Sequence, residues 1–514
     1  MSDANNQHTL SRRNLLKATL ATSALAASGG ALAAKTKPLP DDITWMPGIE
    51  LRHLIAKKTL SPVEVVEHFL NRIDRLEPTL HAYITVDHEG ARAQAKEAEA
   101  AVMRGDSLGP LHGLPISIKD LYDTKGLRTT QGSMIYKDYI PDSDEILVER
   151  LRKAGAIILG KTQTPEFATF PRTKTLLAGE THNPWDTSRI TGASSGGSGV
   201  AVAAGMSCFS IGSDGGGSTR IPSCFNGVFG LQPSAGRLPM RIPRPVHMAS
   251  AGPMSLHVRD SAALIQVMSG KDHRDPSAIE SSSPDFLGEL DKGVDGYRIA
   301  WSRDWGCIPD VEPRVTDTIA AAAKLFGDAG AHLDNPNIVL PDDKAWSVFL
   351  TINETSYHRG GRLLDFTPEQ QALLTPPTQQ MLEQVKNAQK ISSTKHIEAL
   401  KNRAELAHWM DGIFEKYDLI CTPTLGIVAP KIPDAPWDQP YLDPYYARHI
   451  STSYTYIVNV LGLAAASVPC GFVDGLPVGL QIIGPRFADL KVMRAAQAFS
   501  KLKPWMNTHP ALAS

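Results

Sequence analysis

The chain has 514 residues, of which 42% are hydrophobic and 21% are charged, a composition typical of a soluble globular protein that can bury a large core. Its formal net charge is −2, and the sequence contains no long run of like charges. The charge pattern therefore gives no reason to expect nucleic acid or an acidic membrane as a partner. A small neutral molecule fits this composition better.

Residues 1–33 are typical of an export signal. Arg12 and Arg13 precede an alanine-rich, weakly apolar stretch that begins at Ala18 and ends in small residues suited to cleavage. The alternative is a membrane anchor, but this stretch is shorter than the roughly 20 residues that span a bilayer. We therefore expect a twin-arginine-type signal, a single domain over residues 34–514, no stable membrane insertion after cleavage, and a periplasmic or secreted protein.

The first helix of the mature chain is predicted by a capping box. Ser61 is the cap, Pro62 takes the first helical position, Glu64 completes the box, and apolar residues continue at helical spacing. Short strand-like runs then alternate with helical stretches, which predicts an α/β fold in one large domain. The predicted strands are His81–Val86, Leu114–Ile118, Ala156–Leu159, Asp418–Thr422 and Val478–Ile483, and further helices are Ala91–Arg104 and Ala488–Leu502.

The cysteines and histidines show no metal-ligand spacing. The five cysteines are widely separated and form no CxxC pair, and no HExxH motif is present. We predict that the cysteines are buried and unpaired, and we expect no metal and no cofactor. These cysteines are Cys208, Cys224, Cys307, Cys421 and Cys470.

The stretch Gly155–Thr162 matches the G-x-x-x-x-G-K-T pattern of a phosphate-binding loop. Its four middle residues are Ala, Ile, Ile and Leu, which favour a buried strand over an exposed loop. Pro165 follows closely and would interrupt the helix whose N-terminus should hold the phosphate. We therefore predict a strand here and no nucleotide site.

Two clusters of glycine and serine raise the question of a reactive serine. "SDGGGST" at Ser213–Thr219 can be a linker, a phosphate cradle or a turn that holds a nucleophile. "GASSGGSG" at Gly192–Gly199 leads into the small-residue run "VAVAAG", which suits a closely packed helix. With a cluster at each end of one short segment, we expect Ser194, Ser195 and Ser218 to come together.

A serine is a weak nucleophile until a base takes its proton, and the only histidine near these clusters in sequence is His182. In "GLPISIKD", strand alternation leaves Lys119 near the end of a strand. Two interpretations of Lys119 are open at this point: a surface lysine paired with Asp120, or the base for the serines.

Several long motifs, in order, resemble the amidase signature family through most of the mature chain. This resemblance implies a single domain in which helices enclose a mixed β-sheet, in agreement with the α/β prediction. The motifs are "GPLHGLPISIKD" from Gly109, "GKTQTPEFA" from Gly160, "HNPWDTSRITGASSGGSGVAVAAG" from His182, "SDGGGSTRIPS" from Ser213, "GVFGLQPSAGRLP" from Gly227, "AGPMSLHVRDSAALIQVMSG" from Ala251 and "VPCGFVDGLPVGLQIIG" from Val468.

The resemblance implies an amidase that works through an acyl-enzyme. Ser218 would be the nucleophile, and Ser194, which would lie on a cis peptide bond, would relay its proton to Lys119, the base. Ser195 would support the relay by a hydrogen bond. The backbone amides expected to form the oxyanion hole are those of Gly215, Gly216, Gly217 and Ser218.

The resemblance says less about the substrate. Ala168 matches a substrate-contacting position of some members, whereas Gly215 and Ala193 depart from the usual residues and are expected to line the acyl site. The segment Ala435–Tyr456 is rich in Trp and Tyr; it can border the pocket or simply pack as aromatic core. If it borders the pocket, aryl or bulky hydrophobic amides are favoured, with carbamates, esters or peptide C-terminal amides as alternatives.

Three other classes of protein remain as alternatives, one of which is a nucleotide-binding protein that an ATP titration would distinguish. The A component of a glutamine amidotransferase shares the triad, but it works in the cytoplasm with a protein partner and tRNA, which disagrees with the export signal. An exported solute-binding protein would need no triad. The expected partner is thus a small-molecule amide, without nucleic acid, for a monomer or homodimer.

Overall fold

The computed structural model describes residues 43–241, 248–279, 283–355, 361–388, 390–435, 437 and 443–513. The predicted export signal lies outside these residues. Within them, the chain from Ile43 onward forms one compact α/β unit. None of the described helices is long and apolar enough to cross a membrane.

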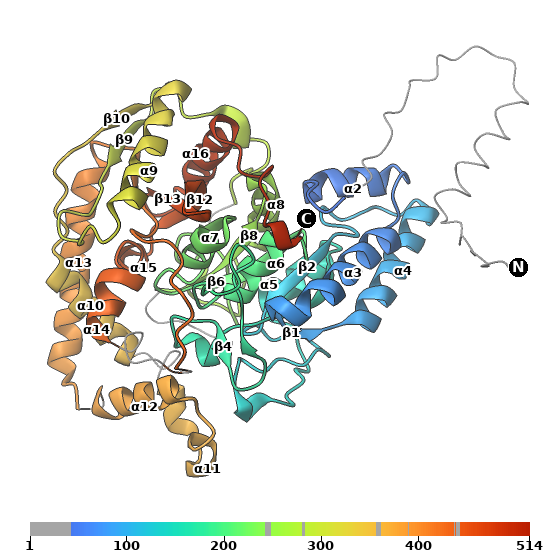
Figure 1. Cartoon of the computed structure of the whole chain (residues 1–514), viewed down its shortest axis with the longest axis horizontal. Helices are drawn as coiled ribbons and strands as arrows, with labels where there is room; N and C mark the ends of the chain where they lie inside the picture. The colour runs from blue at the N-terminus through green and yellow to red at the C-terminus, as the bar shows by residue number, and fades with distance from the viewer. Residues whose placement is uncertain are drawn as a thin grey trace, which may run out of the picture. The chain divides into compact units, whose positions relative to one another are not determined.

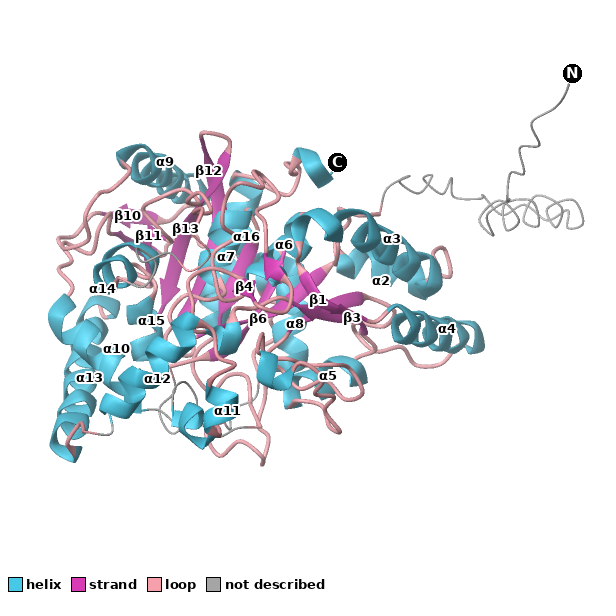
Figure 2. Ribbon diagram, turned by 60° about the horizontal axis from the view of Figure 1, so that its bottom comes forward, coloured by secondary structure: helices cyan, strands magenta, loops and turns pink. Residues whose placement is uncertain are grey.

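A mixed sheet of 11 strands organises this unit (Figures 1 and 2). Parallel pairs occur near one edge and at the other edge, while the middle of the sheet is antiparallel. In spatial order the strands are β1 (Tyr83–Val86), β3 (Ile157–Thr162), β2 (Pro115–Lys119), β6 (Phe209–Asp214), β8 (Ser250–Ser255), β7 (Phe229–Gln232), β12 (Ala464–Val473), β13 (Leu476–Gly484), β11 (Leu419–Pro423), β9 (Arg298–Trp301) and β10 (His332–Asp334). A separate pair consists of β4 (Lys174–Thr175) and β5 (Gly179–Glu180).

Helices flank the sheet (Figure 2). Their bounds are α2 (Gly48–Ala56), α3 (Pro62–Leu80), α4 (His88–Arg104), α5 (Ile146–Lys153), α6 (Gly196–Ala203), α7 (Arg220–Asn226), α8 (Val258–Met268), α9 (Pro313–Ala323), α10 (Asp342–Thr355), α11 (Pro368–Gln371), α12 (Pro376–Ala388), α13 (Ser393–Phe414), α14 (Pro444–Tyr446), α15 (Tyr456–Leu461) and α16 (Asp489–Leu502).

The two faces of the sheet carry different cores, as the two-residue period of a strand requires. Along β12, Ala464 and Ala466 belong to the large core that includes α9 and α16. The residue between them, Ala465, belongs to a second core with α10, α13 and α15. All three residues are buried, so this part of β12 does not alternate between buried and exposed positions.

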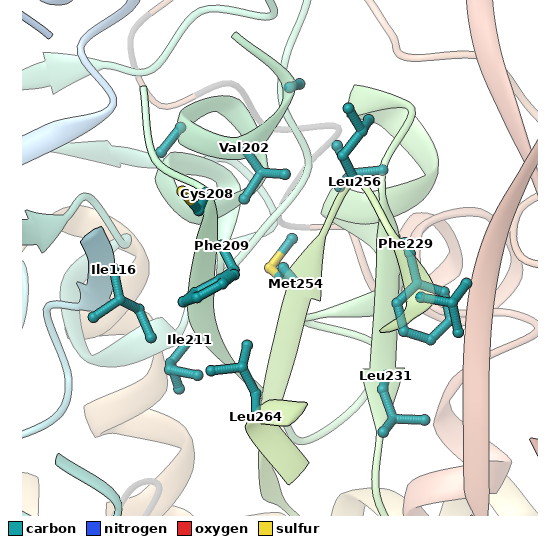
Figure 3. Packing of buried hydrophobic residues seen from close by; sticks show 14 of the residues in the cluster. Ile116, Val202, Cys208, Phe209, Ile211, Phe229, Leu231, Met254, Leu256 and Leu264 are labelled. Carbon is teal, nitrogen blue, oxygen red and sulfur yellow. The ribbon is translucent and has the colours of Figure 1, made fainter. Parts of the chain in front are cut away.

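Figure 3 shows the core where the site-bearing strands pack. Ile116 of β2, Phe209 of β6 and Met254 of β8 are fully buried in it. Leu264 of α8 packs against the same strands. This packing fixes β2 and β6 as neighbours, with their ends at one edge of the sheet.

The elements predicted from the sequence are all present. The capping box at Ser61 forms as expected and begins α3. The pattern at Gly155–Thr162 becomes the buried strand β3, and the small-residue run becomes α6, which starts within the preceding glycines. One prediction was wrong: the cysteines are unpaired, but Cys307 is exposed, because it lies in the loop after β9 and not in a core.

Candidate active site

The site begins at the end of β2. This strand pairs in parallel with β3 on one side and with β6 on the other, so the carboxyl ends of all three meet at one edge of the sheet. Lys119 is the last residue of β2, and Asp214 is the last residue of β6. Both side chains are fully buried.

The Lys119 amine is surrounded by hydroxyl groups. Its Nζ lies 2.7 Å from Ser194 Oγ, 2.9 Å from Ser195 Oγ and 2.9 Å from Ser213 Oγ. Burial lowers the pKa of Lys119 well below its usual range, and the nearby Asp214 carboxylate offsets this only in part. The environment therefore favours the neutral amine.

Asp120 does not pair with Lys119. Its carboxylate accepts hydrogen bonds from the Thr130 amide at 3.0 Å, the Thr130 hydroxyl at 2.5 Å and the Gly132 amide at 3.3 Å. Of the two interpretations of Lys119, the surface ion pair with Asp120 is wrong.

Ser194 and Ser195 immediately precede α6, where the glycines of the first cluster let the backbone approach its neighbours. The peptide bond between Ala193 and Ser194 is cis. A Cβ at Gly197 would lie 2.4 Å from the Ala82 carbonyl oxygen, so only glycine fits there. The start of α6 is thereby held against the residue that precedes β1 and the residue that follows β3.

The second cluster forms the loop between β6 and α7, and it holds Ser218 beside the first cluster. The Ser195 amide donates to the Ser218 carbonyl oxygen at 3.1 Å. The predicted approach of Ser194, Ser195 and Ser218 is confirmed by this bond and by the cavity that Ser194 and Ser218 both line. In the part of the chain that the structure describes, Ser218 Oγ has no hydrogen-bond partner.

A buried ion pair closes this loop. Asp214 accepts two hydrogen bonds from the Arg220 guanidinium, both at 2.9 Å, and one from the Gly217 amide at 2.7 Å. Burial alone would raise the pKa of Asp214, but Arg220 and the other donors hold it below its usual range. Arg220 also donates to Asn459 and Gln481, which ties the loop to α15 and β13.

The backbone amides of this loop differ in whether they already donate a hydrogen bond. The Gly217 amide is occupied by Asp214, so its predicted role in an oxyanion hole would require that bond to be shared or broken. Among the described residues, the amides of Gly215, Gly216 and Ser218 have no acceptor. They remain candidates for binding an oxyanion.

A cavity of about 300 Å³ opens onto Ser194 and Ser218. Ala168 and Ala193 line it, as predicted, but Gly215 does not. A Cβ at Gly215 would instead approach Ala249 at 3.2 Å. Most of the remaining wall is apolar, and its aromatic residues are Phe170, Phe225, Trp346, Phe349 and Tyr446.

The described residues of the aromatic segment Ala435–Tyr456 both border the cavity and pack in the core, the two roles that the sequence left open. Tyr446 lines the cavity, whereas Tyr454 and Tyr456 are buried in the second core. Trp437 packs on Phe170, with ring centroids 5.5 Å apart. Residues 436 and 438–442 of this segment lie outside the described part.

Sequence reasoning missed three polar groups of the site. Ser213 contacts the Lys119 amine, and Asp214 and Arg220 brace the loop that carries Ser218. Their positions at either end of the glycine run were a signal, because a carboxylate and a guanidinium six residues apart can clamp a tight turn. No group of three or more potential metal-binding side chains occurs in the described regions.

Comparisons with known proteins agree with this geometry. The profile of the family described as Amidase matches residues 64–493. An acylamidase of Rhodococcus erythropolis is 34% identical over 478 residues, covering 91% of this chain and 98% of that protein. The A component of the glutamyl-tRNA(Gln) amidotransferase of Dehalococcoides mccartyi is 32% identical over 485 residues, covering 89% of this chain and 97% of that protein.

The fold comparison points the same way. The crystal structure of a bacterial aryl acylamidase of the amidase signature family matches with a TM-score of 0.82 and 28% identity, covering 90% of this chain and 97% of the other. Both chains are therefore matched over nearly their full length. From its motifs, its fold and these matches together, the chain belongs to the amidase signature family.

Proposed function

We propose that this chain hydrolyses the C–N bond of carboxylic amides through an acyl-enzyme on Ser218. One observation carries the proposal: the buried Lys119 amine bonds to Ser194 with no carboxylate in contact, at a cavity that Ser218 also lines. A desolvated amine of this kind can accept a proton at neutral pH, which an ordinary lysine cannot.

The hydrogen bonds support a definite direction of proton transfer. The Ser195 hydroxyl donates to the Ser213 carbonyl oxygen at 3.1 Å, so it accepts from Lys119. A neutral amine has two hydrogens and one lone pair. One hydrogen of the neutral amine is directed at Ser195, and directing the second at Ser213 leaves the Lys119 lone pair for the proton of Ser194.

The proposed reaction runs in two steps. Ser218 Oγ attacks the amide carbonyl while its proton passes through Ser194 to Lys119. The C–N bond then breaks, the departing nitrogen takes the proton back, and the acyl group stays on Ser218. Water then attacks the acyl carbon and gives a proton to the same relay. The C–O bond to Ser218 breaks, Ser218 Oγ takes that proton back, and the carboxylic acid leaves.

The substrates that we propose are aryl or bulky hydrophobic amides. The aromatic wall formed by Phe170, Phe225, Trp346 and Phe349 supports this class, because flat apolar groups gain most from such a lining. The names of two similar proteins, an acylamidase and an aryl acylamidase, agree with it. Carbamates, esters and peptide C-terminal amides are the alternative substrates.

The test is an activity screen over anilides, aliphatic amides, amino-acid amides, carbamates and esters, with Ser218→Ala as control. We expect the full chain to hydrolyse anilides and the Ser218→Ala protein to lose turnover by a factor of about 10³ or more, because no nucleophile remains. A serine-directed fluorophosphonate should label Ser218 alone. Labelling that persists in the variant would contradict the assignment of the nucleophile.

A further inference from the structure

One charged side chain stands out in the cavity wall. Among the described residues that line the cavity, Glu354 is the only one with a charge at neutral pH. It belongs to the last turn of α10, which presents Trp346, Phe349, Leu350 and Asn353 to the same cavity. Their spacing of three and four residues places them on one face of the helix.

Glu354 is half-buried and has no partner within the described part of the protein. Its carboxylate makes no hydrogen bond and no ion pair with any described residue. Burial raises the pKa of Glu354, and the charge of Lys395 on α13 lowers it only in part. A partly desolvated carboxylate without a partner is costly, and a cationic ligand would relieve that cost.

The helix sets the distance between Glu354 and the reacting serine. Phe349 lies against the nucleophile loop, since a Cβ at Gly216 would be 3.1 Å from its ring. Glu354 follows five residues later, about 7.5 Å further along the axis of α10 at 1.5 Å per residue. Glu354 therefore lies further along α10 than Phe349, the residue of this helix that contacts the nucleophile loop.

The neighbouring wall, formed by α12, offers no competing charge. α12 packs beside α10 (Figure 2) and lines the cavity with Gln380, Met381, Gln384 and Val385. These side chains are apolar or neutral. Among its described lining residues, the cavity therefore combines Ser194 and Ser218, a largely apolar wall and one carboxylate, that of Glu354.

We propose that Glu354 is a specificity-determining residue that binds a cationic end group of the substrate. The preferred substrates are amides in which an apolar spacer separates the scissile carbonyl from an ammonium group. This inference rests on the proposed amidase function, and binding and turnover are measured separately so that the two can fail independently.

Binding is tested first, by calorimetric titration of the full chain with hexylammonium and with hexan-1-ol, which is similar in size but uncharged. We expect hexylammonium to bind at least tenfold more tightly, and Glu354→Gln to reduce that ratio by about tenfold, as befits a hydrogen bond to a charged group. Glu383→Gln is the matched control, because Glu383 is an exposed carboxylate on α12 paired with Lys386. This control should keep the wild-type ratio.

Turnover is tested with acyl anilides whose chains end in an ammonium or in an isosteric methyl group, and with anilides that carry the same two groups on the ring. We expect kcat/KM to favour the ammonium member of one pair by about tenfold, Glu354→Gln to abolish that preference and Glu354→Lys to reverse it. Equal preference in wild type and Glu354→Gln, in binding or in turnover, would overturn the role of Glu354. Selective binding of the cation without hydrolysis of any amide would instead refute the proposed function and leave the cation site standing.

Discussion

Lys119 has what a catalytic base needs and a structural lysine would lack. A buried lysine is normally retained by a carboxylate partner, because an unpaired buried charge is expensive. Here the nearest carboxylate in sequence, Asp120, is fully used by Thr130 and Gly132. The amine meets only the hydroxyls of serines, so losing its proton costs it little.

The activity of the enzyme should follow the protonation of Lys119. Since its pKa lies well below the usual range, activity should be low in acid and rise toward neutral and alkaline pH as the amine loses its proton. Lys119→Met should reduce kcat by a factor of about 10² to 10⁴, the usual contribution of general-base catalysis. Initial rates on an anilide from acid to alkaline pH measure both effects.

Lys119→Arg provides the control for charge in that experiment. A guanidinium remains protonated at all relevant pH values and cannot act as the base, so this variant should be as inactive as Lys119→Met. Near-normal rates in Lys119→Arg at neutral pH would show that Lys119 acts only as an electrostatic support.

The same residue makes a prediction about stability. Between its lowered pKa in the folded chain and about 10.4 in the unfolded chain, the unfolded state binds more protons. The free energy of unfolding should therefore rise with pH across that window. Lys119→Met removes this contribution. The thermal midpoint of the variant, relative to that of the wild type, should therefore be higher near neutral pH than near about pH 10. A constant difference at both pH values would contradict a lowered pKa.

At the scale of elements, the loop between β6 and α7 is braced from both ends. Asp214 and Arg220 form its buried base, and Thr455 donates a hydrogen bond to the Gly216 carbonyl oxygen at 2.6 Å. Removing one partner of such an ion pair leaves the other charge buried and typically costs about 3 to 5 kcal/mol. The reactive serine is therefore placed by a rigid turn and not by a flexible linker.

Gly217→Ala should disable this turn. Gly217 has φ +122°, and a Cβ there would lie 2.3 Å from Thr455 Oγ1. We expect kcat to fall by about tenfold or more as the loop shifts, since small displacements of reacting groups are costly. Steady-state kinetics on an anilide provide the measurement.

Gly475→Ala is the matched control for that variant. Gly475 also has a positive φ, +77°, but no atom lies within 4 Å of its added Cβ. This variant should lose about 1 kcal/mol of stability from backbone strain and keep the wild-type kcat. If the two variants lose activity equally, the position of the turn at Gly217 is not what matters.

The strength of the local sequence signal decided which helices and strands could be predicted. Elements with strong local signals, such as the capping box of α3 and the apolar run of β3, were predictable. β6 and β8 were missed, because "FSIGSD" and "SAGPMS" are rich in Ser, Gly and Pro, which have low strand propensity. Burial between neighbouring strands, and not propensity, makes these two segments strands.

The site shows the same division. The motifs indicated Lys119, Ser194 and Ser218, and the geometry brings them to one place. The remaining partners of Arg220 and the position of Glu354 beside the Ser218 loop depend on contacts between segments more than 100 residues apart, as in the bond from Arg220 to Asn459. No local pattern in the sequence encodes such contacts.

At the scale of the whole molecule, we propose that residues 1–33 are a twin-arginine-type export signal. If residues 1–33 only direct export, their deletion should change neither kcat nor the thermal midpoint, because the folded unit starts at Ile43.

Replacing Arg12 and Arg13 by lysine should keep the full chain in the cytoplasm. Fractionation of the host cell, with activity as the readout, tests this; unchanged periplasmic enzyme would refute the twin-arginine assignment.

The order of the site's residues along the chain has one more consequence. Lys119, Ser194 and Ser218 come from one stretch of about a hundred residues, whereas α10 and α12 add their part of the cavity wall well over a hundred residues later (Figure 1). The earlier stretch, with the three site residues, and the later stretch, with part of the cavity wall, can therefore change independently during evolution. Changes in the later stretch can alter the cavity wall while Lys119, Ser194 and Ser218 are inherited unchanged, so under the proposed function the substrate range can evolve faster than the catalytic residues.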